Sequence, residues 1–244
     1  MVLDLPTDHP RPPVVSLAHG FVIHSEYDRK LLQRHYNLEQ RPVALIAHGP
    51  YNHYQLATGG QGHRIAPAAC CNLLSFGLIR PYKGLEDLIR AFDALPENEI
   101  VKYWLTIVGE TWEGCTMPTS LIDRSRYRNR ITFVNRYVSD AEVAEFFAGA
   151  DAAVFPYHRS SASGPLHIAM SYGLPVVVTR VGGLIEAVAG YEGTIRVPPG
   201  DPAALRSALL EVAKLHGKRY SDPHSWEHTA IRSHELFDAL RCDF

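Results

Sequence analysis

The sequence lacks the features of a membrane-spanning or secreted chain. No uninterrupted apolar run approaches the roughly 18–20 residues that a membrane span needs. The opening residues, MVLDLPTDHPRPPVV, have neither a basic start nor an apolar segment and therefore predict no signal peptide. We expect a cytoplasmic protein, with peripheral contact to the inner face of a membrane left open.

Cysteine is scarce, and neither sign of charge dominates. The four cysteines include the adjacent Cys70 and Cys71, a spacing that fits no common metal site and no disulfide framework, so we expect reduced thiols. A formal net charge of −2 gives no reason to expect a nucleic acid as partner. With 244 residues, 46% of them hydrophobic, the chain can bury a core of one domain or somewhat more.

Acidic residues are absent from the stretch HRSSASGPLHIAMSYGLPVVVTRVGG, residues 158–183. Ser163 is a candidate N-cap, and Gly164 and Pro165 suit a first helical turn, where proline sacrifices no hydrogen bond. The free N–H groups and the positive end of the helix dipole predict an anion site, to which Ser160 adds a hydroxyl. An ordinary capped helix is the alternative.

Short β-rich runs alternate with amphipathic helices from Cys70 onward. Strands are predicted at NLLSFGLI, WLTIVG, ITFVNRYV, DAAVFPY, PVVVTRV and GTIRV. The segment GLEDLIRAFDAL places apolar residues at i, i+3, i+4 and i+7, which is typical of an amphipathic helix. This alternation predicts an α/β fold, a doubly wound parallel sheet covered on both faces, over residues 70–217.

Shorter elements flank this domain. FVIHS predicts a strand, Ser25 caps a helix that runs to about His35, and PVALIAHG predicts a second strand ending at Gly49. The polar, glycine-rich segment 51–67 has no periodicity and predicts a linker. DPHSWEHTAIRSHELFDALR predicts a last helix, capped at Ser225.

Ligands of doubly wound sheets bind in the loops at the carboxyl ends of the strands. The first such loop, FGLIRPYKG, offers Gly77 for close backbone approach. Its Arg80 and Lys83 suit a diphosphate, Arg80 as a bidentate fork and Lys83 as a point charge. Solvated surface cations are the alternative.

The next two strand ends carry weaker signals. In IVGE, Gly109 lets the chain turn beside a ligand, and Glu110 offers an acceptor. In NRYVS, Arg136 and Tyr137 are candidates for flanking a base or a sugar, although surface roles fit them equally well.

Together these segments resemble the C-terminal domain of the family 4, or group 1, glycosyltransferases. The segments that carry the resemblance are SFGLIRPYKGLEDLIRAF, LTIVGE, ITFVNRYVSDAEVAEFFAGADAAVFPY, AMSYGLPVVVTRVGGLIEAV and GTIRVPPGDPAAL. The resemblance implies a GT-B architecture of two Rossmann-like domains, the C-terminal one holding most of a nucleotide-sugar donor. It also places Glu186 where the family has a glutamate.

The resemblance implies retaining transfer of a hexosyl group from a UDP- or GDP-sugar to an acceptor alcohol, a glycan or a lipid-linked molecule, with no metal required. The catalytic roles fall to Arg80 and Lys83. The implied domains are a remnant of the N-terminal domain at 1–55, a linker at 56–69, the nucleotide-sugar-binding domain at 70–217 and a returning helix at 218–244.

Three departures from the family pattern bear on activity. Ser160 and Ile168 stand where members typically carry two glutamates, and Leu78 replaces the usual arginine of the first loop. Only about 55 residues precede the linker, fewer than a whole domain needs. A fragment, a chain completed by a separate N-terminal subunit, and a non-catalytic nucleotide- or partner-binding subunit are therefore alternatives. An epimerase or phosphorylase of the same architecture is a further one.

Histidines suggest no metal centre. His224 and His228 are four residues apart at the start of the last helix, but no third ligand is evident, so we interpret them as surface residues. His48 matches a position near the domain junction of the family, where packing is an equally good interpretation. His167 is next to the missing glutamate position but points elsewhere on a helix.

Overall fold

The computed structural model describes residues 15, 17–38, 41–58, 64–111 and 116–241. The chain divides into two compact units, one formed by Met1–Gly49 with His224–Phe244 and the other by Pro50–Pro223. Among the described helices, none combines the length and the apolar character that crossing a bilayer requires.

The larger unit is built on a six-stranded parallel sheet, which confirms the predicted fold class. Its strands in spatial order are β5 (Ile131–Val134), β4 (Tyr103–Val108), β3 (Cys71–Phe76), β6 (Ala152–Phe155), β7 (Val176–Thr179) and β8 (Thr194–Val197). From β3 the chain winds outward through β4 to β5 and then returns to the other side of β3 with β6. The direction of winding therefore reverses between β3 and β6, the place where sheets of this kind bind ligands.

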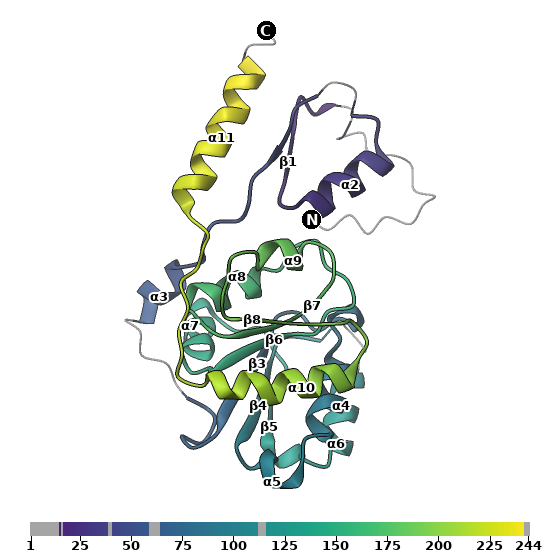
Figure 1. Ribbon diagram of the computed structural model, residues 1–244, viewed down its shortest axis with the longest axis vertical. Helices are drawn as coiled ribbons and strands as arrows, with labels where there is room; N and C mark the ends of the chain where they lie inside the picture. The colour runs from purple at the N-terminus through teal and green to yellow at the C-terminus, as the bar shows by residue number, and fades with distance from the viewer. Residues whose placement is uncertain (1–14, 16, 39–40, 59–63, 112–115, 242–244) are drawn as a thin grey trace. The chain divides into compact units, whose positions relative to one another are not determined.

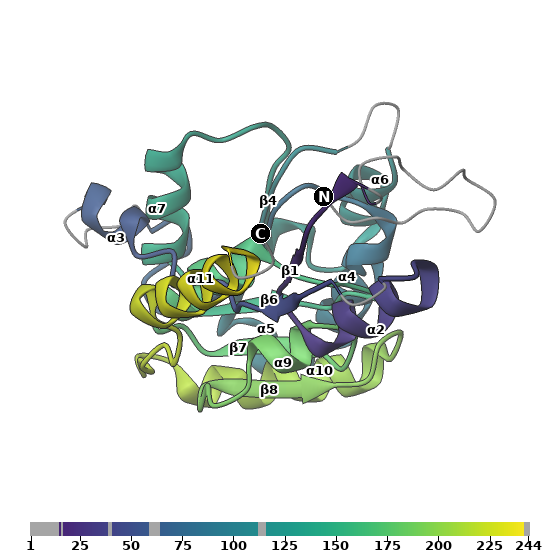
Figure 2. The ribbon, with the colours of Figure 1, turned by 90° about the horizontal axis from the view of Figure 1, so that it is seen from above.

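Helices cover both faces of this sheet (Figure 1 and Figure 2). One face is covered by α4 (Leu85–Asp93), α6 (Met117–Arg124) and α10 (Pro202–Val212), and the other by α7 (Asp140–Ala148), α8 (Gly164–Ser171) and α9 (Leu184–Ala187). Neighbouring residues of β3 alternate between the two cores, Leu73 in one and Leu74 in the other. Each such buried leucine stabilises the fold by about 1.5–3 kcal/mol.

Several predicted helix starts are confirmed. The Ser139 hydroxyl accepts a hydrogen bond from the Glu142 N–H, and the Glu142 carboxylate accepts one from the Ser139 N–H, completing a capping box at α7. Ser163 caps α8 by accepting from the Leu166 N–H. The short helix α5 (Glu97–Ile100) and the 3-10 turns η1 (Pro81–Lys83), η2 (Arg128–Arg130) and η3 (Ala213–Leu215) complete the unit.

A short helix, α3 (His53–Thr58), lies where the sequence predicts an irregular linker. It packs against α7. The Tyr51 N–H donates to the Ser171 hydroxyl at 3.0 Å, and the Gln55 amide donates to the Ser171 carbonyl. Both bonds go to Ser171 at the end of α8, far along the chain, so no local sequence pattern signals the helix.

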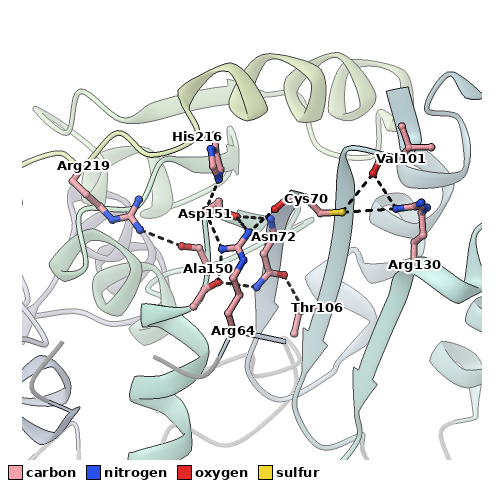
Figure 3. Close-up of polar contacts among 11 residues, drawn as sticks. Arg64, Cys70, Asn72, Val101, Thr106, Arg130, Ala150, Asp151, His216 and Arg219 are labelled. Atoms are coloured by element: carbon pink, nitrogen blue, oxygen red, sulfur yellow. Dashed lines mark hydrogen bonds and ion pairs between the residues drawn. The ribbon is translucent and has the colours of Figure 1, made fainter. Parts of the chain in front are cut away.

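The polar cluster at the amino ends of the strands centres on Asp151 (Figure 3). Asp151 is buried, and its carboxylate accepts hydrogen bonds from Arg64 Nη2 and from the Asn72 N–H, each at 2.7 Å. His216 Nε2 lies 3.1 Å from the same carboxylate. The hydrogen bond to Asp151 raises the pKa of the Arg64 guanidinium. Because Arg64 precedes β3 and His216 follows η3, one carboxylate binds the segment before the first strand of the sheet and the segment after α10 and η3.

Both cysteines within the described residues are free thiols. Cys70 and Cys71 are buried beside this cluster, and burial raises the pKa of Cys71 to about 12, so its thiol stays protonated at neutral pH. Cys115 and Cys242 lie outside the described residues.

The smaller unit contains a two-stranded parallel sheet, β1 (Phe21–Ile23) and β2 (Val43–Leu45), with the helices α2 (Glu26–His35) and α11 (Trp226–Arg241). Ser25 caps α2, and the Ser225 hydroxyl accepts from the Glu227 N–H at the start of α11, both as predicted. The strand β2 ends at Leu45 rather than at Gly49. The helix α11 packs against β2.

Candidate functional site

The loops that follow β3 and β6 lie beside each other because these strands are neighbours in the sheet. Gly77 begins the first loop with a φ of +114°, a conformation that favours glycine. A Cβ atom built on Gly77 would lie 3.0 Å from Lys83 Nζ and 3.2 Å from Pro165 Cγ. The structure therefore brings the Lys83 ammonium and the first turn of α8 to the same glycine.

Tyr157 connects the two loops. Lys83 Nζ lies over its ring, 4.9 Å from the centroid, and its hydroxyl lies 3.4 Å from the Ser163 hydroxyl. The ring is buried, and the Thr179 hydroxyl donates to the Tyr157 carbonyl at 2.5 Å. The sequence prediction did not include Tyr157, because a tyrosine at a strand end is an ordinary core residue until the strand order is known.

Further contacts hold the two loops together. The His158 N–H donates to the Tyr82 carbonyl at 2.7 Å, and His158 Nε2 lies 2.7 Å from the Asp87 carboxylate. Gly84, with φ +66°, allows α4 to start directly beside the β6 loop, since a Cβ there would lie 1.9 Å from the Pro156 carbonyl oxygen. Contacts of Tyr82 and Gly84 with the β6 loop thus fix the backbone on either side of Lys83.

The start of α8 is only partly covered by other residues. Ser163 is buried as the N-cap, whereas Gly164 and Pro165 are half-buried. Near a Cβ built on Gly164 the nearest heavy atom is the Tyr51 hydroxyl oxygen, at 3.8 Å. First-turn N–H groups of a helix and its dipole attract anions, so Lys83 and α8 present two sources of positive potential at one place.

The remaining predicted residues of this loop lie around that site. The Ser160 hydroxyl donates to the Ala162 carbonyl at 2.9 Å, and the Ser160 carbonyl accepts from the Gly183 N–H at 3.1 Å. That bond places the start of α9, which carries the half-buried Glu186, beside the β6 loop. Arg80 immediately precedes η1 and is half-buried, three residues before Lys83.

Arg136 and Tyr137 follow β5, two strands away from β3 in the sheet. Arg136 forms an ion pair with Glu142, and this pairing is the main reason that the pKa of Glu142 falls to about 2. Tyr137 is 78% exposed. The structure does not group these two with Lys83, and their contact with a base or sugar stays a prediction.

The two positions without glutamates have different surroundings. Ile168 is buried in the apolar core on the α8 face of the sheet, while Ser160 lies in the turn described above. His167 is also buried, and its ring centroid lies 6.2 Å from that of Tyr51. Within the described residues, which include His224 and His228, no three His, Cys, Asp or Glu side chains lie close enough together to hold a metal ion.

A family model described as "Glycosyl transferases group 1" matches residues 71–214. The chain belongs to the group 1 glycosyl transferases. O-antigen chain mannosyltransferase B of Escherichia coli is 27% identical over 177 residues, which cover 68% of this chain and 45% of that protein. D-inositol 3-phosphate glycosyltransferase 2 of Catenulispora acidiphila is 34% identical over 155 residues, covering 59% of this chain and 36% of that protein.

This group 1 glycosyl transferase chain therefore matches less than half the length of each of these two relatives. Solved structures show the same fold. Sucrose-phosphate synthase of Thermosynechococcus elongatus superposes with a TM-score of 0.71 at 21% identity, covering 95% of this chain and 61% of that one. HepE of Anabaena, solved with UDP and glucose, superposes with a TM-score of 0.65 at 18% identity, covering 94% of this chain and 65% of that one.

Proposed function

We propose that this chain binds a nucleotide-sugar donor, a UDP- or GDP-sugar, and transfers its hexosyl group to an acceptor alcohol with retention of the anomeric configuration. The observation that carries the proposal is the position of the Lys83 ammonium beside Gly77 and Pro165, at the start of α8. A lysine and a helix N-terminus at the place where the winding reverses suit a diphosphate. HepE, which has the same fold, was solved with UDP and glucose.

In the proposed reaction the bond between the anomeric carbon and the terminal diphosphate oxygen breaks. Its electron pair stays on the diphosphate, while the acceptor oxygen bonds to the anomeric carbon on the face that the diphosphate leaves, and the acceptor proton passes to the departing diphosphate oxygen. Lys83, Arg80 and the N–H groups at the start of α8 stabilise the negative charge that grows on the leaving diphosphate. The glycan or lipid-linked acceptor is held by the N-terminal half of a complete GT-B enzyme.

Isothermal titration of the chain with UDP and GDP tests the donor site. We expect Lys83→Ala to weaken binding of the preferred nucleotide at least tenfold, because a charge-assisted contact to phosphate is lost. Arg80→Ala should weaken it as well. Lys214→Ala removes the same charge from η3, next to the segment that binds Asp151 at the opposite end of the sheet, and should leave the affinity unchanged. Equal affinities for all four proteins would refute the site.

A second candidate function is binding without catalysis, favoured by Ser160 and Ile168 in place of the two glutamates. In that case the chain serves as a nucleotide-binding or partner-binding subunit. Hydrolysis or transfer assays with radiolabelled UDP- and GDP-hexoses separate the two. Turnover of a donor by this chain supports the enzyme, while tight nucleotide binding without any turnover supports the subunit.

A further inference from the structure

The Lys83 ammonium contacts an aromatic ring rather than a carboxylate. Lys83 Nζ lies 4.9 Å from the centroid of the Tyr157 ring, within the range of a cation–π contact. The two acidic residues in the first turn of α4 have other partners: Glu86 pairs with Arg90, and Asp87 with His158. Among the described carboxylates, none forms an ion pair with Lys83.

An aromatic ring and a carboxylate beside Lys83 would affect the binding of an anion in opposite ways. A carboxylate would neutralise the ammonium and compete with an incoming phosphate, whereas the face of an aromatic ring attracts the cation and leaves its charge available. Tyr157 is well suited to this task because it is itself fixed. Its ring packs edge-on against Phe155 and Tyr82, with centroids 5.9 Å and 6.5 Å away, and is 3% exposed.

The same side chain also reaches the helix that faces the lysine. Its hydroxyl lies 3.4 Å from the hydroxyl of Ser163, the N-cap of α8. One rigid ring therefore contacts both halves of the candidate anion site, the lysine from the β3 loop and the cap from the β6 loop.

We propose that Tyr157 is a positioning residue that holds the Lys83 ammonium, un-neutralised, at the start of α8 for the diphosphate of the donor. This inference rests on the proposed function. It predicts that removing the ring weakens nucleotide binding through Lys83, and that replacing tyrosine with phenylalanine preserves most of the binding.

A double-mutant cycle on the full chain, read by calorimetric titration with UDP and GDP, tests the coupling. Y157F should bind within about twofold of the unmodified protein, and Y157L about fivefold more weakly, which is the size of a partly buried cation–π contact. In a K83M background, Y157L should have no further effect. The inference is overturned if Y157L alone leaves the nucleotide affinity unchanged, or if Y157L still lowers that affinity fivefold in the K83M background.

Tyr191 provides a matched control for lost packing. It is also a tyrosine with 3% exposure, and its hydroxyl donates to the Leu174 carbonyl at 2.8 Å, away from Lys83. Y191L should lower thermal stability without a specific loss of nucleotide affinity. If Y191L weakens binding as much as Y157L does, the effect of Tyr157 is structural and the inference is wrong.

One further measurement is decisive where Y157L fails to fold, and a second one where no nucleotide binds. Pentafluorophenylalanine at position 157 keeps the shape of the ring but reverses its electrostatic attraction for a cation, and it should weaken nucleotide binding relative to Y157F. In the free protein, the NMR signals of the Lys83 side-chain methylene groups should be shifted upfield by the ring and keep that shift in Y157F. Absence of this shift overturns the inference on its own, whereas its presence without nucleotide binding refutes only the proposed function.

Discussion

Gly109 and Gly77 are in backbone contact: a Cβ atom on Gly109 would lie 2.1 Å from the Gly77 carbonyl oxygen. Gly109 also has a φ of +148°, which L side chains rarely adopt. The loop after β4 therefore supports the backbone of the loop after β3. Any side chain at Gly109 must displace Gly77, and with it the contact to Lys83.

Gly109→Ala should lower the free energy of unfolding by about 2–4 kcal/mol, because backbone strain and a steric clash add up. It should also weaken nucleotide binding. Gly200→Ala is the control, since Gly200 has φ +67° but no heavy atom within 4 Å of a Cβ placed on it, so only strain of about 1–2 kcal/mol is introduced. If denaturant unfolding shows that both variants lose the same free energy of unfolding, the contact with Gly77 contributes nothing to the cost of Gly109→Ala.

Asp151→Asn should destabilise the larger unit by about 2–3 kcal/mol, because the Arg64 guanidinium, with 28% of its side chain exposed, loses its charged partner. Denaturant unfolding measures this loss. Nucleotide affinity of the folded protein should not change, since Asp151 lies at the opposite end of the strands. Asp123→Asn, at an exposed position on α6, should stay within about 0.5 kcal/mol of the unmodified protein.

His48 should make the smaller unit sensitive to acid. Burial, and then the neighbouring His24 and His224, lower the pKa of His48 from 6.5 to about 4. The unfolded chain therefore binds more protons between these two values, so the stability contribution is full above about pH 6.5 and is lost as the pH falls through 4. NMR titration should place the His48 midpoint near 4. His48→Gln should reduce the acid sensitivity of unfolding, whereas His228→Gln, at an exposed position, should not.

The capping box of α7 should titrate at unusually low pH. The Arg136 side chain and the Ser139 N–H and hydroxyl all bind the Glu142 carboxylate, which lowers its pKa from 4.5 to about 2. The contribution of this carboxylate to stability is therefore present above about pH 4.5 and is lost as the pH falls through 2. In NMR titrations Arg136→Gln should raise the Glu142 midpoint. Arg128→Gln, on η2, should leave it in place, and an unchanged midpoint in both variants would contradict the ion pair.

The elements that the sequence predicts well are those whose signals are local. The β-branched run of β7 and the apolar spacing of α4 determine their own structures, and Ser139 and Ser163 cap helices within three residues of themselves. Glycine at the end of β3 likewise indicates close backbone approach before any strand order is known.

What the sequence does not predict depends on distant partners. The helix α3 is fixed by Ser171, and no apolar period marks it. The contact between Lys83 and Tyr157 exists because β6 pairs with β3, and a single sequence does not specify that pairing. The ion pair between Arg136 and Glu142 joins two residues that each have a separate local explanation, a strand-end cation and a capping glutamate.

The cluster around Asp151 also brings the two ends of residues 64–216, the part of the larger unit that contains the whole sheet, close together in space. Arg64 Nη2 and His216 Nε2 both lie close to one carboxylate, at 2.7 Å and 3.1 Å. A domain whose ends meet in this way is suited to circular permutation. A short linker can join the two ends near Arg64 and His216, and the exposed turn at Gly200 offers a place for new termini. The loops after β3 and β6 keep their connections in such a molecule, so we expect the proposed anion site to form whichever end of the chain comes first.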